Sequence, residues 1–205
     1  MAAMVTIENG FAEIGAGVWL MGRAQPAAFF GALARRRRKG LFLRDRAHLD
    51  LVETTAKARL SDATRPFLTH IPCAAPLSAV SPKVLLAPAD AWTGAELVRV
   101  VPMSLMRALC VSAFDHEWAL MATSGRTARI AVDEGDTLSV RPDAVVAWTG
   151  PRPTGFCPRL RLSDVLLPRG PRDLLLHFHG PAVVWVEGSQ AETRKPKAMG
   201  RYYGA

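Results

Sequence analysis

Two histidines near the C-terminal end have a spacing that metal sites use. His177 and His179 are two residues apart in a strand-like segment, so both imidazoles would lie on one face of a strand. Leu176 and Phe178 would occupy the other face, which is also the ordinary pattern of an amphipathic strand with a solvent-facing pair. Because no third ligand is evident in the sequence, we predict no metal site and no bound cofactor.

Acid, base and nucleophile candidates are also present, but their surroundings do not suit catalysis. Asp115, His116 and Glu117 are adjacent, and adjacent residues on an extended chain alternate faces and cannot all converge on one substrate atom. This triplet is more typical of a loop. Ser124-Gly125 and Ser163-Asp164 lack the strand-to-helix context of a nucleophile elbow, and the sequence contains no Gly-rich phosphate loop. We therefore predict a non-enzymatic protein without catalytic residues.

The segment from Pro26 to Lys39 is the main candidate for a functional surface, because an apolar stretch runs directly into a basic cluster. As an interfacial segment it could place its aromatic residues at a membrane surface while the basic residues meet acidic lipid. The alternative is a surface excursion whose aromatic residues pack on the protein or a neighbouring subunit while the arginines stay solvated. The candidate contact residues are Phe29, Phe30, Leu33, Arg35, Arg36, Arg37, Arg38 and Lys39.

The overall charge agrees with an anionic partner. The 205 residues include 26 Lys and Arg against 18 Asp and Glu, which gives a formal net charge of +8 and favours nucleic acid or acidic lipid. A single-strand binder is expected to interleave exposed aromatic and basic residues, whereas Trp19, Trp148 and Trp185 lie within apolar runs and are predicted to be core. RNA binding is therefore kept as the alternative function.

The cysteines and the N-terminus bear on location. Cys73, Cys110 and Cys157 are odd in number and far apart, which suits a reducing compartment better than a disulfide framework. The N-terminal residues do not resemble a signal or transit peptide, and no apolar run reaches the about 20 residues of a membrane span. The expected location is the cytoplasm.

The elements that must position these residues are short and strand-like. Apolar alternation and β-branched or aromatic content, separated by Gly, Pro and Asp turns, predict an all-β sandwich or barrel. The predicted strands are 18–21, 41–43, 49–52, 97–101, 127–132, 137–140, 144–148, 174–178 and 182–186.

Other stretches depart from this pattern. Pro26 to Arg38 and Val52 to Leu60 could be helical, and Arg65 to Pro88 carries five prolines, which indicates a loop or an irregular edge. Residues 1–188 are predicted to form one domain, and 189–205 a basic, loosely ordered tail. An echo between Val111-x-Ala113-Phe114 and Val145-x-Ala147-Trp148 suggests a duplicated β unit.

Three stretches resemble the family named for Altered Inheritance of Mitochondria protein 24. They are the Ala27–Ala34 stretch that leads through the arginine run into Gly40-Leu41-Phe42-Leu43, the Arg141–Trp148 stretch that ends in "VVAW", and the Phe178–Val186 stretch. In the last of these, Ala182 stands where the family usually has the second glycine of "GPG".

The resemblance implies a fold similar to that of the tryptophan RNA-binding attenuation protein. Such a fold is a β-sandwich or double-stranded β-helix that tends to assemble, here with one short helical or irregular excursion, and it carries over no catalytic residues. Fungal relatives are linked to mitochondrial membrane organisation, which makes a mitochondrial, membrane-peripheral location the alternative. We predict a structural or scaffolding protein that forms homo-oligomers and contacts a protein partner or an acidic membrane surface.

Overall fold

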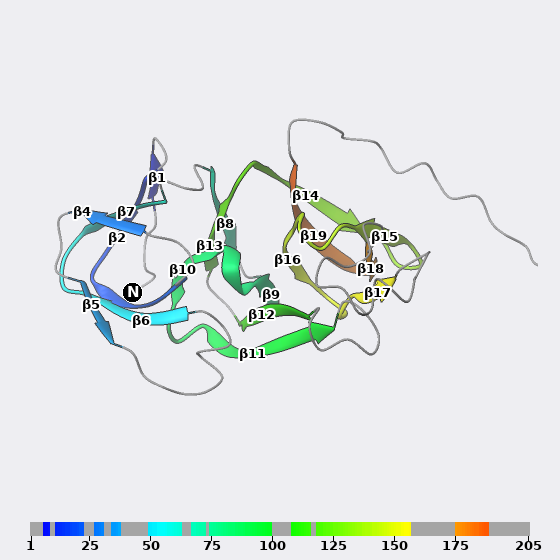
Figure 1. Cartoon of the computed structure of the whole chain (residues 1–205), viewed down its shortest axis with the longest axis horizontal. Helices are drawn as coiled ribbons and strands as arrows, with labels where there is room; N and C mark the ends of the chain where they lie inside the picture. The colour runs from blue at the N-terminus through cyan, green and yellow to red at the C-terminus, as the bar shows by residue number, and fades with distance from the viewer. Residues whose placement is uncertain are drawn as a thin grey trace, which may run out of the picture.

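Strands account for nearly all regular structure in the described part of the chain, so the prediction of an all-β fold is confirmed. The computed structural model describes residues 6–8, 11–22, 27–30, 34–37, 49–62, 67–72, 74–99, 108–115, 118–156 and 175–188. Within these ranges the one helical element is a 3-10 turn, η1 (Ser81–Lys83), and the strand ladders are antiparallel (Figure 1).

The strands fall into three successive units of six, which follow a short first strand, β1 (Thr6–Glu8). The first unit contains β2 (Phe11–Ile14), β3 (Gly17–Gly22), β4 (Ala27–Phe30), β5 (Ala34–Arg37), β6 (Leu49–Thr54) and β7 (Ala58–Asp62). The second contains β8 (Phe67–Pro72), β9 (Leu77–Val80), β10 (Val84–Pro88), β11 (Trp92–Arg99), β12 (Ala108–Phe114) and β13 (Trp118–Thr123). The third contains β14 (Arg126–Val132), β15 (Thr137–Val140), β16 (Val145–Thr149), β17 (Thr154–Phe156), β18 (Leu175–His179) and β19 (Ala182–Gly188).

Each unit repeats the same strand order and divides into two half-sheets. The first, sixth and third strands form one half-sheet, as in β2-β7-β4, β8-β13-β10 and β14-β19-β16. The fourth, fifth and second strands form the other, as in β5-β6-β3, β11-β12-β9 and β17-β18-β15. The second strand of one unit then pairs with the third strand of the next, through β3·β10 and β9·β16.

These joints produce four sheets. Sheet 1 has the order β1-β2-β7-β4, sheet 2 β5-β6-β3-β10-β13-β8, sheet 3 β11-β12-β9-β16-β19-β14, and sheet 4 β15-β18-β17. The six-stranded sheets 2 and 3 are therefore each shared by two consecutive units. Figure 1 shows the units following one another along the long axis, with β4 near one end and β15 near the other.

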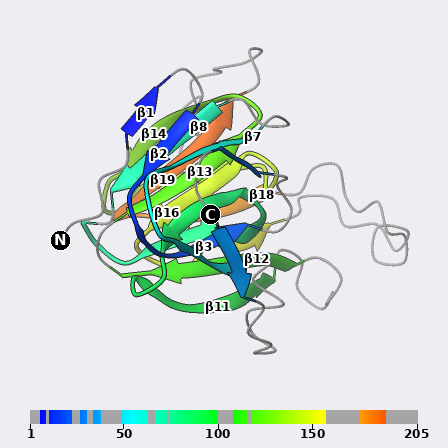
Figure 2. The ribbon, with the colours of Figure 1, turned by 90° about the vertical axis from the view of Figure 1, so that its left-hand side faces the viewer.

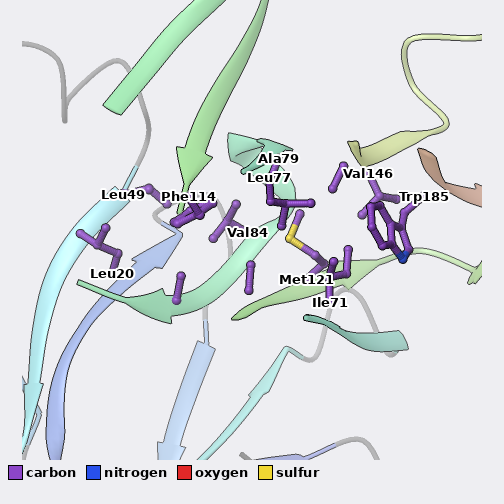
Figure 3. Packing of buried hydrophobic residues seen from close by; sticks show 13 residues of the cluster. Leu20, Leu49, Ile71, Leu77, Ala79, Val84, Phe114, Met121, Val146 and Trp185 are labelled. Atoms are coloured by element: carbon purple, nitrogen blue, oxygen red, sulfur yellow. The ribbon is translucent and has the colours of Figure 1, made fainter. Parts of the chain in front are cut away.

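Three apolar cores separate the four sheets. The first core, between sheets 1 and 2, includes Trp19, Leu85 and Leu120. The second, between sheets 2 and 3, includes Leu20, Phe114 and Met121, whose side chains Figure 3 shows spread along this core. The third, between sheets 3 and 4, includes Trp148, Phe178 and Val184. Viewed from the end of the first unit, strands of successive sheets overlie one another with similar slopes (Figure 2).

The two helical stretches predicted from the sequence are wrong. Pro26 to Arg38 contains the strands β4 and β5, which pair with β7 and β6. Val52 to Leu60 contains the end of β6 and the start of β7, which belong to different sheets. Helix propensity is a weak preference, and here the pairing with neighbouring strands overrides it.

The proline-rich stretch from Arg65 to Pro88, predicted to be a loop or an irregular edge, contains β8, β9, η1 and β10, and of these strands β8 lies at the edge of sheet 2. The prolines stand where a missing N–H is tolerated: Pro72 and Pro88 are the last residues of their strands, and Pro82 lies in η1. The inference from proline content to a loop failed because Pro72 and Pro88 end strands and Pro82 lies in the short turn between two strands, so none of these three interrupts a strand.

Other expectations have mixed outcomes. Trp19, Trp148 and Trp185 are buried, as predicted. Val111 and Val145, which suggested a duplicated unit, lie on the fifth strand of one unit and the third strand of the next, so their echo does not mark the structural repeat. The predicted strand 41–43 and the tail 189–205 lie outside the described residues.

Candidate functional surface

The apolar-basic segment forms the edges of two adjacent sheets. Phe29 and Phe30 end β4, at the edge of sheet 1, and Arg35, Arg36 and Arg37 occupy β5, at the edge of sheet 2. Residues 31–33 connect the two strands, so the apolar and basic parts belong to different sheets. Three of the predicted contact residues, Leu33, Arg38 and Lys39, lie outside the described residues.

The register of β5 sets what its arginines face in sheet 2. Arg35 is paired with Glu53, which is exposed, whereas Arg36 is paired with Val52, which is fully buried in the first core. Among the described strands β5 pairs with β6 alone, so the other side of its backbone faces away from sheet 2. The surface therefore combines a free strand edge with a run of three arginine positions, which suits contact with an anionic or strand-like partner.

A second basic edge was missed by sequence reasoning. Strand β14 forms the edge of sheet 3, and its Arg126 and Arg129 are exposed. The two arginines are scattered among apolar residues and do not form a run, so charge clustering gave no signal. Their position at an edge follows from the strand order, which the sequence does not reveal.

The histidine pair lies on the outer face of sheet 4, as its spacing predicts. Leu176 and Phe178 are fully buried, whereas His177 is half-buried and His179 exposed. The Thr137 hydroxyl lies 3.0 Å from Nδ1 of His179, and His177 is paired with Ser139 and Thr154 on its two neighbouring strands. No group of three His, Cys, Asp or Glu side chains suited to a metal ion occurs among the described residues. The face therefore presents two imidazoles among hydroxyl groups.

Partial burial, and then the nearby His179, lower the pKa of His177 below the ordinary histidine value of 6.5. Below that pH the unfolded chain takes up the proton first, so stability decreases as the pH falls through the lowered pKa. We expect His177→Gln to lose less stability than wild type between about pH 7.5 and about pH 5. Urea unfolding at the two pH values measures this. Thr154→Val, a neutral change at a paired position, should keep the wild-type pH dependence; an equal loss in His177→Gln would contradict the assignment.

The sequence also gave no signal for a buried ion pair between the second and third units. Lys83 in η1 donates to Oε1 of Glu187 on β19 at 2.9 Å and to the carbonyl oxygen of Asp143 at 2.5 Å. Oε2 of Glu187 accepts from the backbone N–H of Ser124 at 3.0 Å. Only 8% of the Lys83 side chain and 15% of the Glu187 side chain are exposed. The two residues are 104 positions apart, so the pair is visible only in the fold, where it connects η1, β19 and two turns.

Comparison with known proteins gives a likeness of fold. Protein SPYM3_0169 from Streptococcus pyogenes has a crystal structure that aligns with a TM-score of 0.66 over 91% of this chain and 93% of that chain, at 11% sequence identity. The two proteins share their fold. No family model matches the sequence, and no curated protein is significantly similar to it. Within the described ranges, no helix is long and apolar enough to cross a bilayer.

Proposed function

We propose that this protein is a non-enzymatic scaffold that associates with copies of itself and uses the β4–β5 edges to contact a protein partner or an acidic membrane surface. The observation that carries the proposal is the way in which the units are joined. Each joint pairs the second strand of one unit with the third strand of the next. Among the described strands, one third strand (β4) and one second strand (β15) have no second neighbour. The proposal includes membership of the Altered Inheritance of Mitochondria protein 24 family, on the motifs described above.

The internal packing supports a protein that acts by binding partners through its surface. Sheets 2 and 3 each lie between two apolar cores, and their exposed basic residues lie on strands at their edges. His179, Arg126 and Arg129 are exposed, and β5 lies at a sheet edge. Architectures of stacked repeats characteristically use such extended surfaces for binding.

RNA binding is the second candidate, and the specific observation in its favour is that both six-stranded sheets have an arginine-bearing edge strand, β5 and β14. Binding to a polyanion releases counterions, so its affinity should fall linearly with the logarithm of salt concentration, with a slope of about −0.7 per single-strand phosphate contacted. Apolar docking on a membrane should persist under the same conditions.

Liposome flotation and RNA titration over a salt series separate these functions. We expect Arg35→Ser/Arg37→Ser to lose most binding to liposomes containing acidic lipid, because each basic residue near such a surface contributes about 1 kcal/mol. Arg126→Ser/Arg129→Ser is the matched control, since it removes the same charge from another edge strand and should retain binding. Equal losses in the two variants would indicate a response to net charge alone. Salt-sensitive RNA binding without liposome binding would favour the second candidate.

A further inference from the structure

The first and third units each have one edge strand of the type that pairs with a neighbouring unit inside the chain. The second strand of each of the first two units pairs with the third strand of the following unit, through β3·β10 and β9·β16. The second strand of the third unit is β15, and the third strand of the first unit is β4. Among the described strands, β15 pairs with β18 alone and β4 with β7 alone.

Joining these two strands would complete the pattern of sheets. Sheet 4 has the order β17-β18-β15, and sheet 1 without β1 has the order β4-β7-β2. Placed end to end they would give β17-β18-β15-β4-β7-β2, which repeats unit by unit the orders of sheets 2 and 3. The strand orders of sheets 1 and 4 therefore match the two halves of a shared sheet of this type.

The composition of the edges is a second, independent observation. Exposed edge strands are normally protected from unwanted pairing by charge or proline. Among the described edges, β5, β11 and β14 carry arginines, β8 carries a histidine and a proline, and β1 carries a glutamate. By contrast, β4 (AAFF) and β15 (TLSV) contain neither charge nor proline. The three-residue β17 (TGF) is the other unprotected edge, and it is too short to template an extended pairing.

We infer that β15 of one molecule pairs antiparallel with β4 of a second copy of this chain, so that molecules join head to tail through the strand pairing that already joins the units within each chain. The inference rests on the self-association in the proposed function and specifies its interface: it assigns the β4 edge to a second copy and leaves the arginine-bearing β5 edge for the membrane surface or another partner. In both internal joints the last three residues of the third strand are paired with the second strand of the preceding unit. In β9·β16 they face the first three residues of that strand, so the same register would pair Ala28, Phe29 and Phe30 with Ser139, Leu138 and Thr137.

A head-to-tail contact uses two different surfaces, so it can propagate to a closed ring or an open chain. Light scattering behind size exclusion should therefore give masses at multiples of 22.2 kDa. Ser139→Lys places a charge on the β15 edge and should shift the protein to the monomer mass. Thr154→Lys is the matched control, because Thr154 is also exposed but lies on β17, at the opposite edge of sheet 4. Its oligomer should persist, and circular dichroism should show that both variants are folded.

Cross-linking tests the register and shows which chains are joined. An Ala28→Cys protein mixed with a Ser139→Cys protein should form, on mild oxidation, a disulfide-linked peptide pair detectable by mass spectrometry. An Ala27→Cys partner should not form it, because a shift of one residue places the side chain on the other face. A link found only when both substitutions are in one monomeric chain would mean that the chain closes on itself, and would overturn the inference.

The failure of this interface is distinguishable from failure of the proposed function. An oligomer that survives Ser139→Lys and gives no cross-link would refute the β15·β4 contact while leaving self-association intact. A wild-type protein that is monomeric at all concentrations and binds neither liposomes nor RNA would refute both.

Discussion

Lys83→Met is expected to lower the free energy of unfolding by about 3–5 kcal/mol, because removing one partner of a buried ion pair leaves the other charge without compensation. Glu187 would keep its bond from the Ser124 N–H but lose its 2.9 Å contact with the ammonium group. The carbonyl oxygen of Asp143 would lose its bond from Lys83 as well. Methionine keeps the length of the lysine stem, so the effect reports the charge and not a cavity. Urea unfolding monitored by tryptophan fluorescence measures the change.

Two further variants identify the source of that loss. Lys83→Met/Glu187→Met removes both charges and should recover part of the stability, because no buried charge then remains unpaired. Arg141→Ser breaks an exposed ion pair, in which 68% of the Arg141 side chain and 66% of the Asp143 side chain are exposed. This substitution should change stability by about 0–1 kcal/mol. If Lys83→Met were no more destabilising than Arg141→Ser, the Lys83–Glu187 pair would have to be solvated in solution.

Phe178→Ala is expected to cost a similar amount, about 3–5 kcal/mol, because it removes a fully buried ring and leaves a cavity. Phe178 projects from β18 into the third core, where its ring meets Trp148 edge-on with centroids 5.6 Å apart. Among the described strands, sheet 4 contributes three to this core, so few neighbouring side chains can move in to fill the space. The loss of stability is measured as a lower midpoint of urea unfolding, with an unchanged dependence of the free energy of unfolding on urea concentration.

Phe67→Ala supplies the control for this substitution, because the same atoms are removed from a side chain that is 38% exposed on the edge strand β8. Its effect should lie within about 1 kcal/mol of wild type. A loss for Phe178→Ala that is no greater than for Phe67→Ala would mean that the third core is loosely packed.

The sequence allowed strands with turn residues at their ends to be predicted better than uniformly apolar or proline-containing strands. Thr137–Val140 and Ala182–Val186 were found because their strands have turn residues at both ends. Strand β13 (Trp118–Thr123) was missed, because all six residues are buried between two cores and show no apolar-polar alternation. Strands β8 to β10 were missed because their prolines were taken as loop signals.

The repeat and the functional surface could be predicted only in part, for a related reason. The three units are recognised by their common strand order, whereas the search for similar residues found an echo at non-equivalent positions. The arginine run on β5 was recognised from charge clustering alone. Its place at a sheet edge, the basic edge on β14 and the Lys83–Glu187 pair all depend on contacts between residues far apart in sequence.

The shared sheets also determine whether the chain can be divided. A cut after the first unit, near residue 63, would remove β3 from β10 and uncover Leu85, Leu86 and Leu120, which pack against the strands of that unit. A cut after the second unit would separate β9 from β16 in the same way. The three units therefore repeat the same strand order, but no single unit is expected to be stable alone. Every fragment that ends at a unit boundary loses a strand pairing within a shared sheet. Because neighbouring units share sheets, we expect the three units to unfold together and not one at a time.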